Sequence, residues 1–564
     1  MQINILDNTV QTFFSDLPYG PLLQTVLRQR CQDESAIHEY LKKDHKLYDP
    51  YTIYGMQPAV SYIENAIAKN ASFAIHGDFD VDGVCATTIL WDYLYYQRGV
   101  TCTPIIPNRV DEGYGLSDQT VQKAINSGAD VIITVDCGIT DIEIVQKYRT
   151  SIDFIITDHH QFLTDEKNRI MLPEAQAVVH SAHPEGKFPV MISGAATSWQ
   201  LVRAIEIHRE KPEVNVESYL DLVALSTVCD IIPLQGENRK LVQAGLKVLN
   251  ENPGTGISEL IQHCNISNPI DTFHCGFVLG PRLNAASRVT HDAMDALRLL
   301  ATRNQQQATR LAVKLDSLNT ERKQLTETYI ARAEQHIDNK KKGIVIIDKA
   351  WPEGILGLIA GRLAEKYQRP VYIGSIDSKG HIIGSSRSPL RSFPLHKSLE
   401  YAASHLERYG GHMQAAGFAS TEKLIHGFED TILEYIERCT QPDDFLPAID
   451  VDIEIGDIST ITLEEIGELS LLEPFGLGNP KPLCLLRACK LLDFKMVGSL
   501  QNHVKMKVVH GSTPVDVIGF NMPDIAERLS IGKDINPVGH LRVNEWNGSL
   551  SRELELQYLE DQES

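Results

Sequence analysis

Three clusters of Asp and His residues follow apolar runs of the chain. The first is His76-Gly-Asp78-Phe-Asp80-Val-Asp82, and the other two are Thr134-Val-Asp136-Cys-Gly138 and Thr157-Asp158-His159-His160. Carboxylates this close in sequence repel one another unless cations offset their charge. Mixed carboxylate and imidazole ligands suit divalent ions such as Mn²⁺ or Mg²⁺. These residue types therefore predict a metal site, and metal-assisted hydrolysis of a phosphoester is the chemistry that such a site supports.

The first cluster also has simpler interpretations when it is taken alone. It fits a calcium loop or a solvated turn, although an EF-hand would need a Glu at a set distance and flanking helices, which this segment lacks. A lone Asp or His at the end of a strand is more often a cap or a satisfied core group than a ligand. Three clusters at the same end of successive parallel strands would converge in space, which favours one shared site.

The elements that must position these clusters alternate along the chain from residue 72. The apolar runs SFAIHGDFD, VIITVDCGIT and FIITDHHQ each end in a polar cluster, and helical stretches such as 83–97 and 117–127 lie between them. This alternation predicts βαβ units and a parallel sheet covered on both faces. Working residues of such sheets lie just beyond the carboxyl ends of the strands. The predicted fold class is therefore α/β.

Further units follow this first one. A segment without Gly or Pro, at about 304–338, repeats apolar residues at helical spacing and predicts one long amphipathic helix that connects domains. A smaller α/β unit begins with the strand GIVIID, and after residues 441–444 the short alternating runs HVKMKVVH, PVDVIGF, INPVGHLRV and RELELQYL predict a small β-barrel. The expected division is an N-terminal segment at 1–60, a catalytic domain at 61–303, a connector helix at 304–340, a second α/β domain at 341–440 and a barrel domain at 441–564.

Composition limits the classes of protein that this chain can belong to. Its 564 residues, 43% of them apolar and 23% charged, predict several folded domains. The net charge of -21 counts against nucleic-acid binding over the whole surface, so any such contact must be local. The ten cysteines are scattered without a C-x-x-C pair, as in proteins of a reducing cytosol. We expect a cytoplasmic protein without a membrane span, because no run approaches ~18 apolar residues.

The motifs resemble those of a known family. H-x-x-x-D-x-D-G, V-D-x-G and D-H-H are similar to the motifs of the DHH phosphoesterase superfamily, and the resemblance continues through Val228-Cys-Asp230-Ile-Ile-Pro-Leu and Gly280-Pro-Arg-Leu-Asn284-Ala-Ala-Ser-Arg288. Gly384-Ser385-Ser386-Arg387-Ser388 and Gly410-Gly411-His412 resemble the DHHA1 domain. Glu473-Pro-Phe475-Gly-Leu-Gly478-Asn479-Pro480 resembles the junction of the RecJ family into an OB-fold. The resemblance spans residues 70 to 560.

This resemblance implies a set of site residues. It implies one ion held by His76, Asp80 and Asp136, and a second held by Asp82, Asp136, His159 and Asp230, with Mn²⁺ as the preferred metal and Mg²⁺ as its substitute. The catalytic residues would be His160, Asp136, Asp158 and Asp78. The substrate would contact Arg109, Asn284, Arg288, Ser385, Arg387, Gly411 and His412.

Several of these residues also allow a structural interpretation. Arg109 could instead cap the Asp111-Glu112 turn, and either glycine-rich motif of the second unit could be an ordinary tight turn. In the predicted barrel, the candidates for contact with a single strand are Lys495, Lys505, Lys507 and Phe494, although a solvated strand face is the alternative for any single Lys. The sequence departs from the family pattern at Pro352-Glu353, where His-Pro often stands, and at Ser287, which replaces a usual Gly.

The function implied by the resemblance is that of a metal-dependent exonuclease. It would degrade single-stranded DNA from the 5′ end to mononucleotides in recombination and repair, with helicases or single-strand-binding proteins as candidate partners. Two other hypotheses are a DHH-DHHA1 hydrolase of oligoribonucleotides or cyclic dinucleotides, and a DNA-binding scaffold without activity. A small-substrate hydrolase would tolerate loss of residues 445–564, whereas a long single strand should require them.

Overall fold

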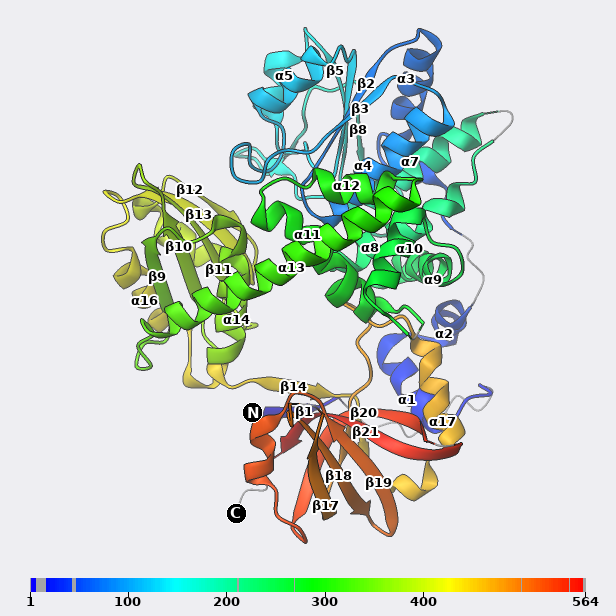
Figure 1. The fold of residues 1–564 in the computed structure, drawn as a ribbon, viewed down its shortest axis with the longest axis vertical. Helices are drawn as coiled ribbons and strands as arrows, with labels where there is room; N and C mark the ends of the chain where they lie inside the picture. Colours follow the sequence, from blue (N-terminus) through cyan, green and yellow to red (C-terminus); the bar gives the residue numbers. More distant parts are fainter. Residues whose placement is uncertain are drawn as a thin grey trace. The chain divides into compact units, whose positions relative to one another are not determined.

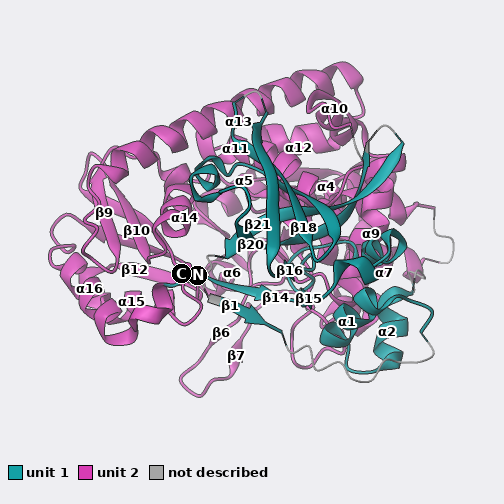
Figure 2. Ribbon diagram, turned by 90° about the horizontal axis from the view of Figure 1, so that it is seen from below, with its two compact units in different colours: residues 1–44, 446–564 teal, residues 45–445 magenta. Residues whose placement is uncertain are grey.

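The computed structural model describes residues 2–6, 17–42, 47–209, 213–267, 269–498, 500–546 and 548–560. The chain forms two compact units, one of residues 1–44 and 446–564 and one of residues 45–445 (Figure 2). The segment expected at 1–60 is therefore divided between them, and its residues 7–16 and 43–46 lie outside the described part. Across the described ranges, every helix is too short or too polar to cross a membrane. The remaining expected domain boundaries stay predictions.

The larger unit contains a parallel five-stranded sheet in the order β3-β2-β4-β5-β8. Its strands are β2 (Phe73–Gly77), β3 (Cys102–Ile105), β4 (Val131–Val135), β5 (Asp153–Asp158) and β8 (Ala177–His180). These strands are short, apolar and buried, as expected for strands that are covered on both faces. The three runs that end in polar clusters are β2, β4 and β5, which are neighbours in the sheet.

Helices cover both faces of this sheet, as the sequence predicts (Figure 1). Ile75 and Ile133 pack in one core with α3 (Met56–Ala68), α4 (Val81–Trp91) and α7 (Gly194–His208). Ala74 and Ile132 point to the other face and pack with α5 (Asp118–Asn126) and α6 (Ile142–Tyr148). Successive strand residues thus enter opposite cores.

A helical layer follows the sheet and ends in a long connector. Its helices are α8 (Leu220–Cys229), α9 (Gly236–Glu251), α10 (Thr255–His263), α11 (Gly280–Val289) and α12 (Met294–Ala301). The predicted connector is α13 (Gln305–Glu334), which ends four residues before the expected end at 338. Leu315 of α13 is buried in the core of the first sheet and Ala333 in a core of the next sheet. One helix therefore takes part in both cores.

The second sheet of the larger unit has the order β12-β13-β11-β10-β9. Its strands are β9 (Ile344–Lys349), β10 (Val371–Ile376), β11 (His381–Arg387), β12 (Arg408–Gly411) and β13 (Ala415–Thr421). Strands β9 and β10 run parallel, and the other neighbours are antiparallel. Helices α14 (Leu356–Tyr367) and α16 (Phe428–Cys439) enter separate cores of this α/β unit.

The smaller unit is a β-barrel. Strands β20 (Asp534–Trp546), β17 (Cys489–Val497), β18 (His503–His510), β19 (Thr513–Gly519) and β21 (Ser549–Glu560) are paired in that order. The sheet closes because β21 pairs with both β19 and β20. Four of these strands contain the alternating runs that predict a barrel, and β17 precedes them.

The N-terminal residues complete this smaller unit. Strand β1 (Gln2–Ile5) pairs in parallel with β14 (Ala448–Val451). Helices α1 (Pro21–Arg30) and α2 (Glu34–Leu41) place Leu23, Leu27 and Ile37 in the same core as the barrel strands. Apolar burial is the dominant favourable term in folding, which explains why residues 1–44 join the C-terminal unit.

Candidate active site

The three polar clusters converge at the carboxyl ends of β2, β4 and β5. Gly77 is paired with Val135, and Val135 is paired with Thr157, so the three strands end at the same level of the sheet. The residues that follow each strand are therefore neighbours in space. This convergence is what the strand order of a parallel sheet predicts.

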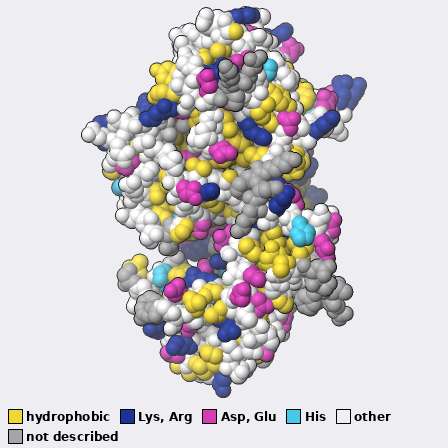
Figure 3. All heavy atoms as spheres, turned by 90° about the vertical axis from the view of Figure 1, so that its right-hand side faces the viewer, with side chains coloured by type: hydrophobic (Ala, Val, Ile, Leu, Met, Phe, Trp, Pro, Cys, Tyr) yellow, Lys and Arg dark blue, Asp and Glu magenta, His cyan; other side chains and the backbone are white. Residues whose placement is uncertain are grey.

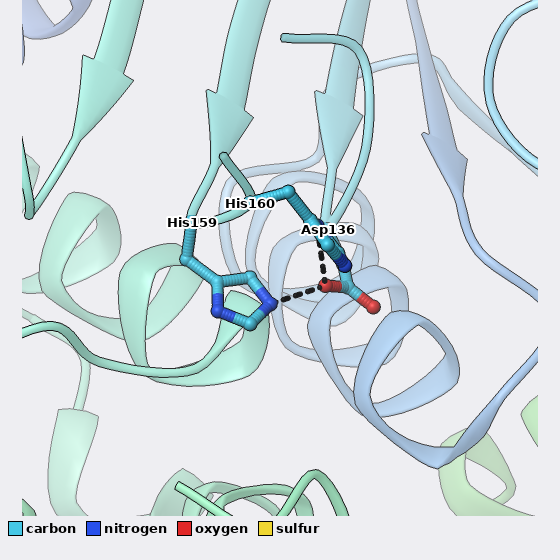
Figure 4. Close-up of side chains that lie close together, drawn as sticks. All are labelled: Asp136, His159 and His160. Atoms are coloured by element: carbon cyan, nitrogen blue, oxygen red, sulfur yellow. Dashed lines mark hydrogen bonds and ion pairs between the residues drawn. The ribbon is translucent and has the colours of Figure 1, made fainter. Parts of the chain in front are cut away.

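His159 lies among three carboxylates. Its Nε2 is 2.9 Å from Oδ1 of Asp136 (Figure 4), and 3.6 Å from Oδ2 of both Asp82 and Asp230. The ligand atoms of Asp82, His159 and Asp230 lie within 4.8 Å of one another. This is a compact set of one imidazole and two carboxylates, with Asp136 beside it.

Asp136 also belongs to a second group. Its carboxylate lies within 4.8 Å of those of Asp78 and Asp80. Asp136 has a φ of 61°, a left-handed conformation that Asp tolerates better than most residues. A Cβ on Gly194 would lie 2.5 Å from Cβ of Asp136, so the chain at the start of α7 leaves no room for a larger residue. Asp136 is thus held tightly between the two groups.

The helix ends fix two of the carboxylates. Asp80 is the N-cap of α4, and its Oδ1 accepts hydrogen bonds from the backbone N–H groups of Asp82 and Gly83. Asp82 is buried and accepts hydrogen bonds of 2.7 Å from the N–H groups of Gly194 and Ala195 at the start of α7. A helix N-terminus attracts a carboxylate, so the start of α7 holds the side chain of Asp82 in place. Ser226 of α8 donates a third hydrogen bond to Asp82, at 2.6 Å.

Asp158 does not join these groups but holds His160 in place. Its Oδ1 is 2.8 Å from Nδ1 of His160, and its Oδ2 accepts a hydrogen bond from the N–H of Ile139. Burial would raise the pKa of Asp158, but these hydrogen bonds outweigh it and lower the pKa to about 2. Burial would likewise lower the pKa of His160, but Asp158 raises it to about 9. His160 is therefore a cation at neutral pH.

Two further side chains support His160. The hydroxyl of Tyr114 is 3.0 Å from Nδ1 of His160 and donates a hydrogen bond to the carbonyl of Asp136. His180, at the end of β8, donates from Nε2 to the carbonyl of His160 at 2.8 Å. Its Nδ1 accepts a hydrogen bond from the N–H of Ala182, which fixes the ring tautomer. Backbone and ring of His160 are thus both positioned.

The remaining carboxylates are in an unfavourable electrostatic state without cations. Burial and the neighbouring carboxylates raise the pKa of Asp78 to about 8 and that of Asp230 to about 9. The same causes raise the pKa values of Asp80 and Asp136. Divalent cations would reverse these shifts, since a nearby positive charge favours the ionised carboxylate.

Buried nitrogens with free lone pairs also fit a metal. Burial lowers the pKa of His76 to about 4, so its ring is neutral at pH 7. Its Nε2 is buried and has no hydrogen-bond partner within the described ranges, while its Nδ1 is 3.5 Å from Sγ of Cys137. One side of the ring is therefore held and the other is open for coordination. The donor set of His76 and the acidic groups fits Mn²⁺ or Mg²⁺.

Buried arginines lie close to the acidic cluster. The guanidinium of Arg109 lies over the ring of Phe79, 4.6 Å from its centroid, and the carboxylates of Asp78 and Asp80 counteract the effect of burial on its pKa. Asn108, not Arg109, caps the following turn, because its Oδ1 accepts from the N–H groups of residues 110 and 111. Among the described contacts, these two hydrogen bonds of Asn108 cap the turn, and the role of Arg109 stays a prediction.

Arg288 and Asn284 extend this region along α11. Burial and the nearby Arg109 and Arg322 lower the pKa of Arg288 to about 9, and its Nη1 donates to the carbonyl of Gly354. Oδ1 of Asn284 is buried without a hydrogen-bond partner among the residues described. No ion pair joins Arg109 or Arg288 to a carboxylate in the part of the chain that the structure describes, and such guanidinium groups favour an anionic ligand.

The second sheet brings its candidate residues to one end. Ser385 and Gly410 are paired with the same residue, Gly417, from opposite sides of β13. Nη1 of Arg387 donates to Oγ of Ser385, and a Cβ on Gly357, in the first turn of α14, would lie 3.0 Å from Nη2 of Arg387. The guanidinium, a hydroxyl and a helix N-terminus are thus adjacent, which suits a phosphate.

The Gly-Gly-His element forms the turn between β12 and β13. Gly411 has a φ of 147°, and a Cβ there would lie 2.4 Å from Cα of Ala416, so the hairpin requires glycine. His412 is exposed in this turn. Within the described ranges, no hydrogen bond joins its side chain to Ser385 or Arg387. His412 thus follows a strand of the same sheet as Ser385 and Arg387, but no described hydrogen bond joins its side chain to either of them.

Comparison with known proteins identifies the family. Residues 72–227 match the DHH family N-terminal domain, residues 339–440 the DHHA1 domain and residues 449–558 the RecJ OB domain. The single-stranded-DNA-specific exonuclease RecJ of Bacillus subtilis is 32% identical over 547 residues, which cover 95% of this chain and 68% of that protein. The chain belongs to the RecJ family. The RecJ of Thermus thermophilus is also 32% identical, over 89% of this chain and 70% of its own length.

Solved RecJ structures share the fold. RecJ of Thermus thermophilus in complex with Mn²⁺ matches with a TM-score of 0.84 at 28% identity, covering 100% of this chain and 80% of that chain. A second exonuclease RecJ, bound to manganese, matches with a TM-score of 0.59 at 32% identity and covers 70% of this chain and 96% of that chain. A Thermus thermophilus RecJ structure with Mg²⁺ is also similar, with a TM-score of 0.78. The predicted combination of DHH, DHHA1 and OB-type domains is confirmed.

The barrel of this RecJ family member carries the four residues expected to contact a single strand. Lys495 and Lys505 lie opposite each other on β17 and β18, and Lys507 lies opposite Asp493. Phe494 is partly buried against the barrel core, so less of its ring is available for stacking than the sequence indicates. On the face shown in Figure 3, Lys and Arg side chains are interspersed with Asp and Glu, so the visible positive charge is scattered on that face.

Sequence reasoning missed four RecJ residues that shape the site. Gly194 and Ser226 support the carboxylates, and Tyr114 and His180 support His160. Tyr114 could have been found, because it lies five residues after Arg109 in the same polar loop. His180 also gave a signal, since it follows an apolar strand as the three clusters do. The other two contacts depend on tertiary packing.

Proposed function

We propose that this chain is a metal-dependent exonuclease that hydrolyses single-stranded DNA from its 5′ end to mononucleotides, in recombination and repair. Its curated relatives are named single-stranded-DNA-specific exonucleases. The observation that carries the proposal is the convergence of buried carboxylates and imidazoles beside arginines without a bound carboxylate. Helicases and single-strand-binding proteins, which expose or coat such strands, are the partners that this function calls for.

We assign two divalent ions to the acidic cluster. His76, Asp80 and Asp136 would hold one, and Asp82, Asp136, His159 and Asp230 the other, with Asp136 shared. In support, Asp136 belongs to two of the compact groups of ligand atoms, and His76 has a buried nitrogen without a partner. When bound, such ions activate water and stabilise the charge that develops on a phosphate. Mn²⁺ is the metal we expect, with Mg²⁺ as a substitute.

His160 and Asp158 would act on the substrate together. Because Nδ1 of His160 faces Asp158 and Tyr114, its Nε2 is the nitrogen left to face the substrate. The raised pKa of His160 keeps a proton on that nitrogen at neutral pH. We assign His160 to donating this proton, or a hydrogen bond, to the phosphate region. Asp78 would orient the bound substrate or water, because its buried Oδ1 lacks a partner within the described part of the chain and is available to such a group.

The arginines would bind the terminal phosphate and fix the direction of cleavage. Burial lowers the pKa values of Arg288 and Arg387, and the nearby Arg109 lowers both further. An anion bound beside these guanidinium groups would relieve the repulsion. Ser385 adds a hydroxyl donor, and Asn284 a buried amide. Gly411 and His412 would close this region from the adjacent hairpin. A phosphate held here would place the 5′ end of the strand next to the metals.

Digestion of end-labelled strands tests the proposal. With Mn²⁺, a 5′-labelled single strand should release labelled mononucleotide first, whereas a 3′-labelled strand should shorten progressively. EDTA should stop both reactions. The Asp136→Ala variant should bind the strand but not cleave it. Equal activity of that variant, release from the 3′ end, or preference for short oligoribonucleotides would contradict the proposed function.

A further inference from the structure

Three large apolar side chains are exposed on segments that adjoin the end of α8, where Asp230 lies. The exposed fraction is 66% for Ile231, 58% for Phe273 and 73% for Phe277. Phe273 and Phe277 are in ring contact with each other, and contiguous exposed apolar groups commonly mark binding sites. None of these residues has a role in the proposed chemistry.

These side chains are placed by elements that also carry the site. Ile231 directly follows Asp230, whose Oδ2 is 3.6 Å from Nε2 of His159. Phe273 and Phe277 belong to a π-helical segment, His274–Leu279 with Phe273 as its N-cap, that leads directly into α11.

The π-helical segment is packed against the last turn of α8. Sγ of Cys229 is 3.5 Å from the carbonyl of Cys275, and a Cβ on Gly276 would lie 3.6 Å from Cγ1 of Val228. Both phenylalanines are therefore carried by an element that touches the residues immediately before Asp230. π-Helical turns are rare and occur frequently at functional sites.

The two phenyl rings are arranged for stacking. Their centroids are 5.2 Å apart and their planes differ by 22°. Cys275 and Leu279 of the same segment are fully buried, so they anchor it while the rings face outward. An aromatic pair with exposed faces is the arrangement on which nucleobases stack, and such stacking tolerates any base because every base has a π-face.

Ile231 adds an independent observation. Its φ is 57°, a left-handed conformation that is unfavourable for a β-branched residue. Gly or Asn would adopt this conformation more easily, and an exposed Ile gains little from packing. Backbone strain of this kind persists mainly where function requires the residue. Both the strain and the exposure are explained if a ligand contacts this side chain.

We propose that Ile231, Phe273 and Phe277 form an apolar platform on which bases of the single-stranded substrate stack beside the scissile phosphate. This inference rests on the proposed function and names how that site holds its substrate. We expect base stacking to be the main source of affinity here. The net charge of -21 limits the affinity that the protein can gain by attracting the phosphate backbone of the strand. Such a platform would hold a strand of any sequence, because every base has a π-face.

A cycle of protein and substrate changes tests the platform. The Phe273→Ala/Phe277→Ala double variant should raise KM for a long single strand by about tenfold, because base-aromatic contacts have effects of that order. Abasic sites in the first few nucleotides should raise KM of the unaltered protein similarly. They should have little further effect on the double variant, since coupled contacts are not additive. An unchanged KM, or fully additive effects, would overturn the platform.

Matched variants separate stacking from folding. Phe277→Tyr keeps the ring and should retain the original KM. Tyr95→Ala removes an exposed ring that stacks on Trp91, at the far end of α4 from Asp82, and should also leave KM unchanged. Ile231→Asn should raise the melting temperature by relieving the strain and yet raise KM. A rise in KM for Tyr95→Ala equal to that of the double variant would argue against the platform.

Binding without hydrolysis distinguishes the platform from the proposed function. In EDTA, a strand with 2-aminopurine near its 5′ end should lose fluorescence on binding the unaltered protein, and should lose less on binding the double variant. If the unaltered protein fails to cleave DNA with Mn²⁺ but quenches the probe, the proposed function fails and the platform stands. If it cleaves DNA and both proteins quench the probe equally, the platform fails alone.

Discussion

The Gly194→Ala substitution tests whether the position of Asp136 controls activity. The added Cβ would lie 2.5 Å from Cβ of Asp136 and 2.8 Å from its Cγ and Oδ1, whereas ordinary contact begins at 3.4 Å. Asp136 would therefore have to move by about 1 Å. A shift of that size in a reactive site can lower the rate by ~10²-fold. Overpacking of this kind should lower the free energy of unfolding by about 1–3 kcal/mol.

Initial rates on a 5′-labelled single strand with Mn²⁺ would measure this effect. We expect the rate of Gly194→Ala to fall by about 100-fold and its Mn²⁺ affinity, followed by electron paramagnetic resonance, to fall as well. Gly467→Ala is the matched control, because a Cβ on Gly467 meets nothing within 4 Å. Urea unfolding would show that both variants are folded. A folded Gly194→Ala protein with the original rate would refute the proposed role of Asp136.

Three other predictions follow from the same contacts. Removal of metal by EDTA should abolish cleavage, and added Mn²⁺ should restore it in an activity assay. His180→Phe removes the hydrogen bond to the carbonyl of His160, and should lower kcat roughly fivefold with little change in KM, since one such bond contributes ~1 kcal/mol. Burial would raise the pKa of Glu206, but hydrogen bonds from Tyr93 and Arg209 lower it below 4.5. A carboxyl group whose pKa is lower in the folded than in the unfolded protein stabilises the fold at pH values above its unfolded pKa. Glu206→Gln should therefore lower the free energy of unfolding at pH 7, and this effect should disappear as the pH falls below 4.5. Urea titrations at several pH values would measure it.

The sequence predicted the fold best where a polar, chemically active cluster ends a run with the apolar pattern of a strand. The runs that end in Asp136 and Asp158 became neighbouring strands, because alternating strands and helices leave few other arrangements. The long connector was equally predictable, since no Gly or Pro interrupts residues 305–334. Closure of the barrel was indicated by the alternating runs of its last strands.

Contacts between distant segments were not predictable from one sequence. The hydrogen bonds to Asp82 come from residues 194, 195 and 226, which no motif connects to it. The role of Asp158 was also ambiguous, because a strand-end Asp can be a ligand or an anchor until its partners are known. The joining of residues 1–44 to the C-terminal unit had no sequence signal beyond apolar spacing in the first helices.

The parallel pairing of β1 with β14 has a consequence for synthesis of the protein. Ile3 is paired with Ile449, so the first strand has no partner until almost the entire catalytic part has left the ribosome. At ~5–20 residues per second, that interval is about 20–90 s. During this time the apolar face of α1, with Leu23 and Leu27, has no barrel core to enter. Nascent chains should therefore depend on chaperones until the barrel strands emerge, and slow translation should lower the yield of native protein.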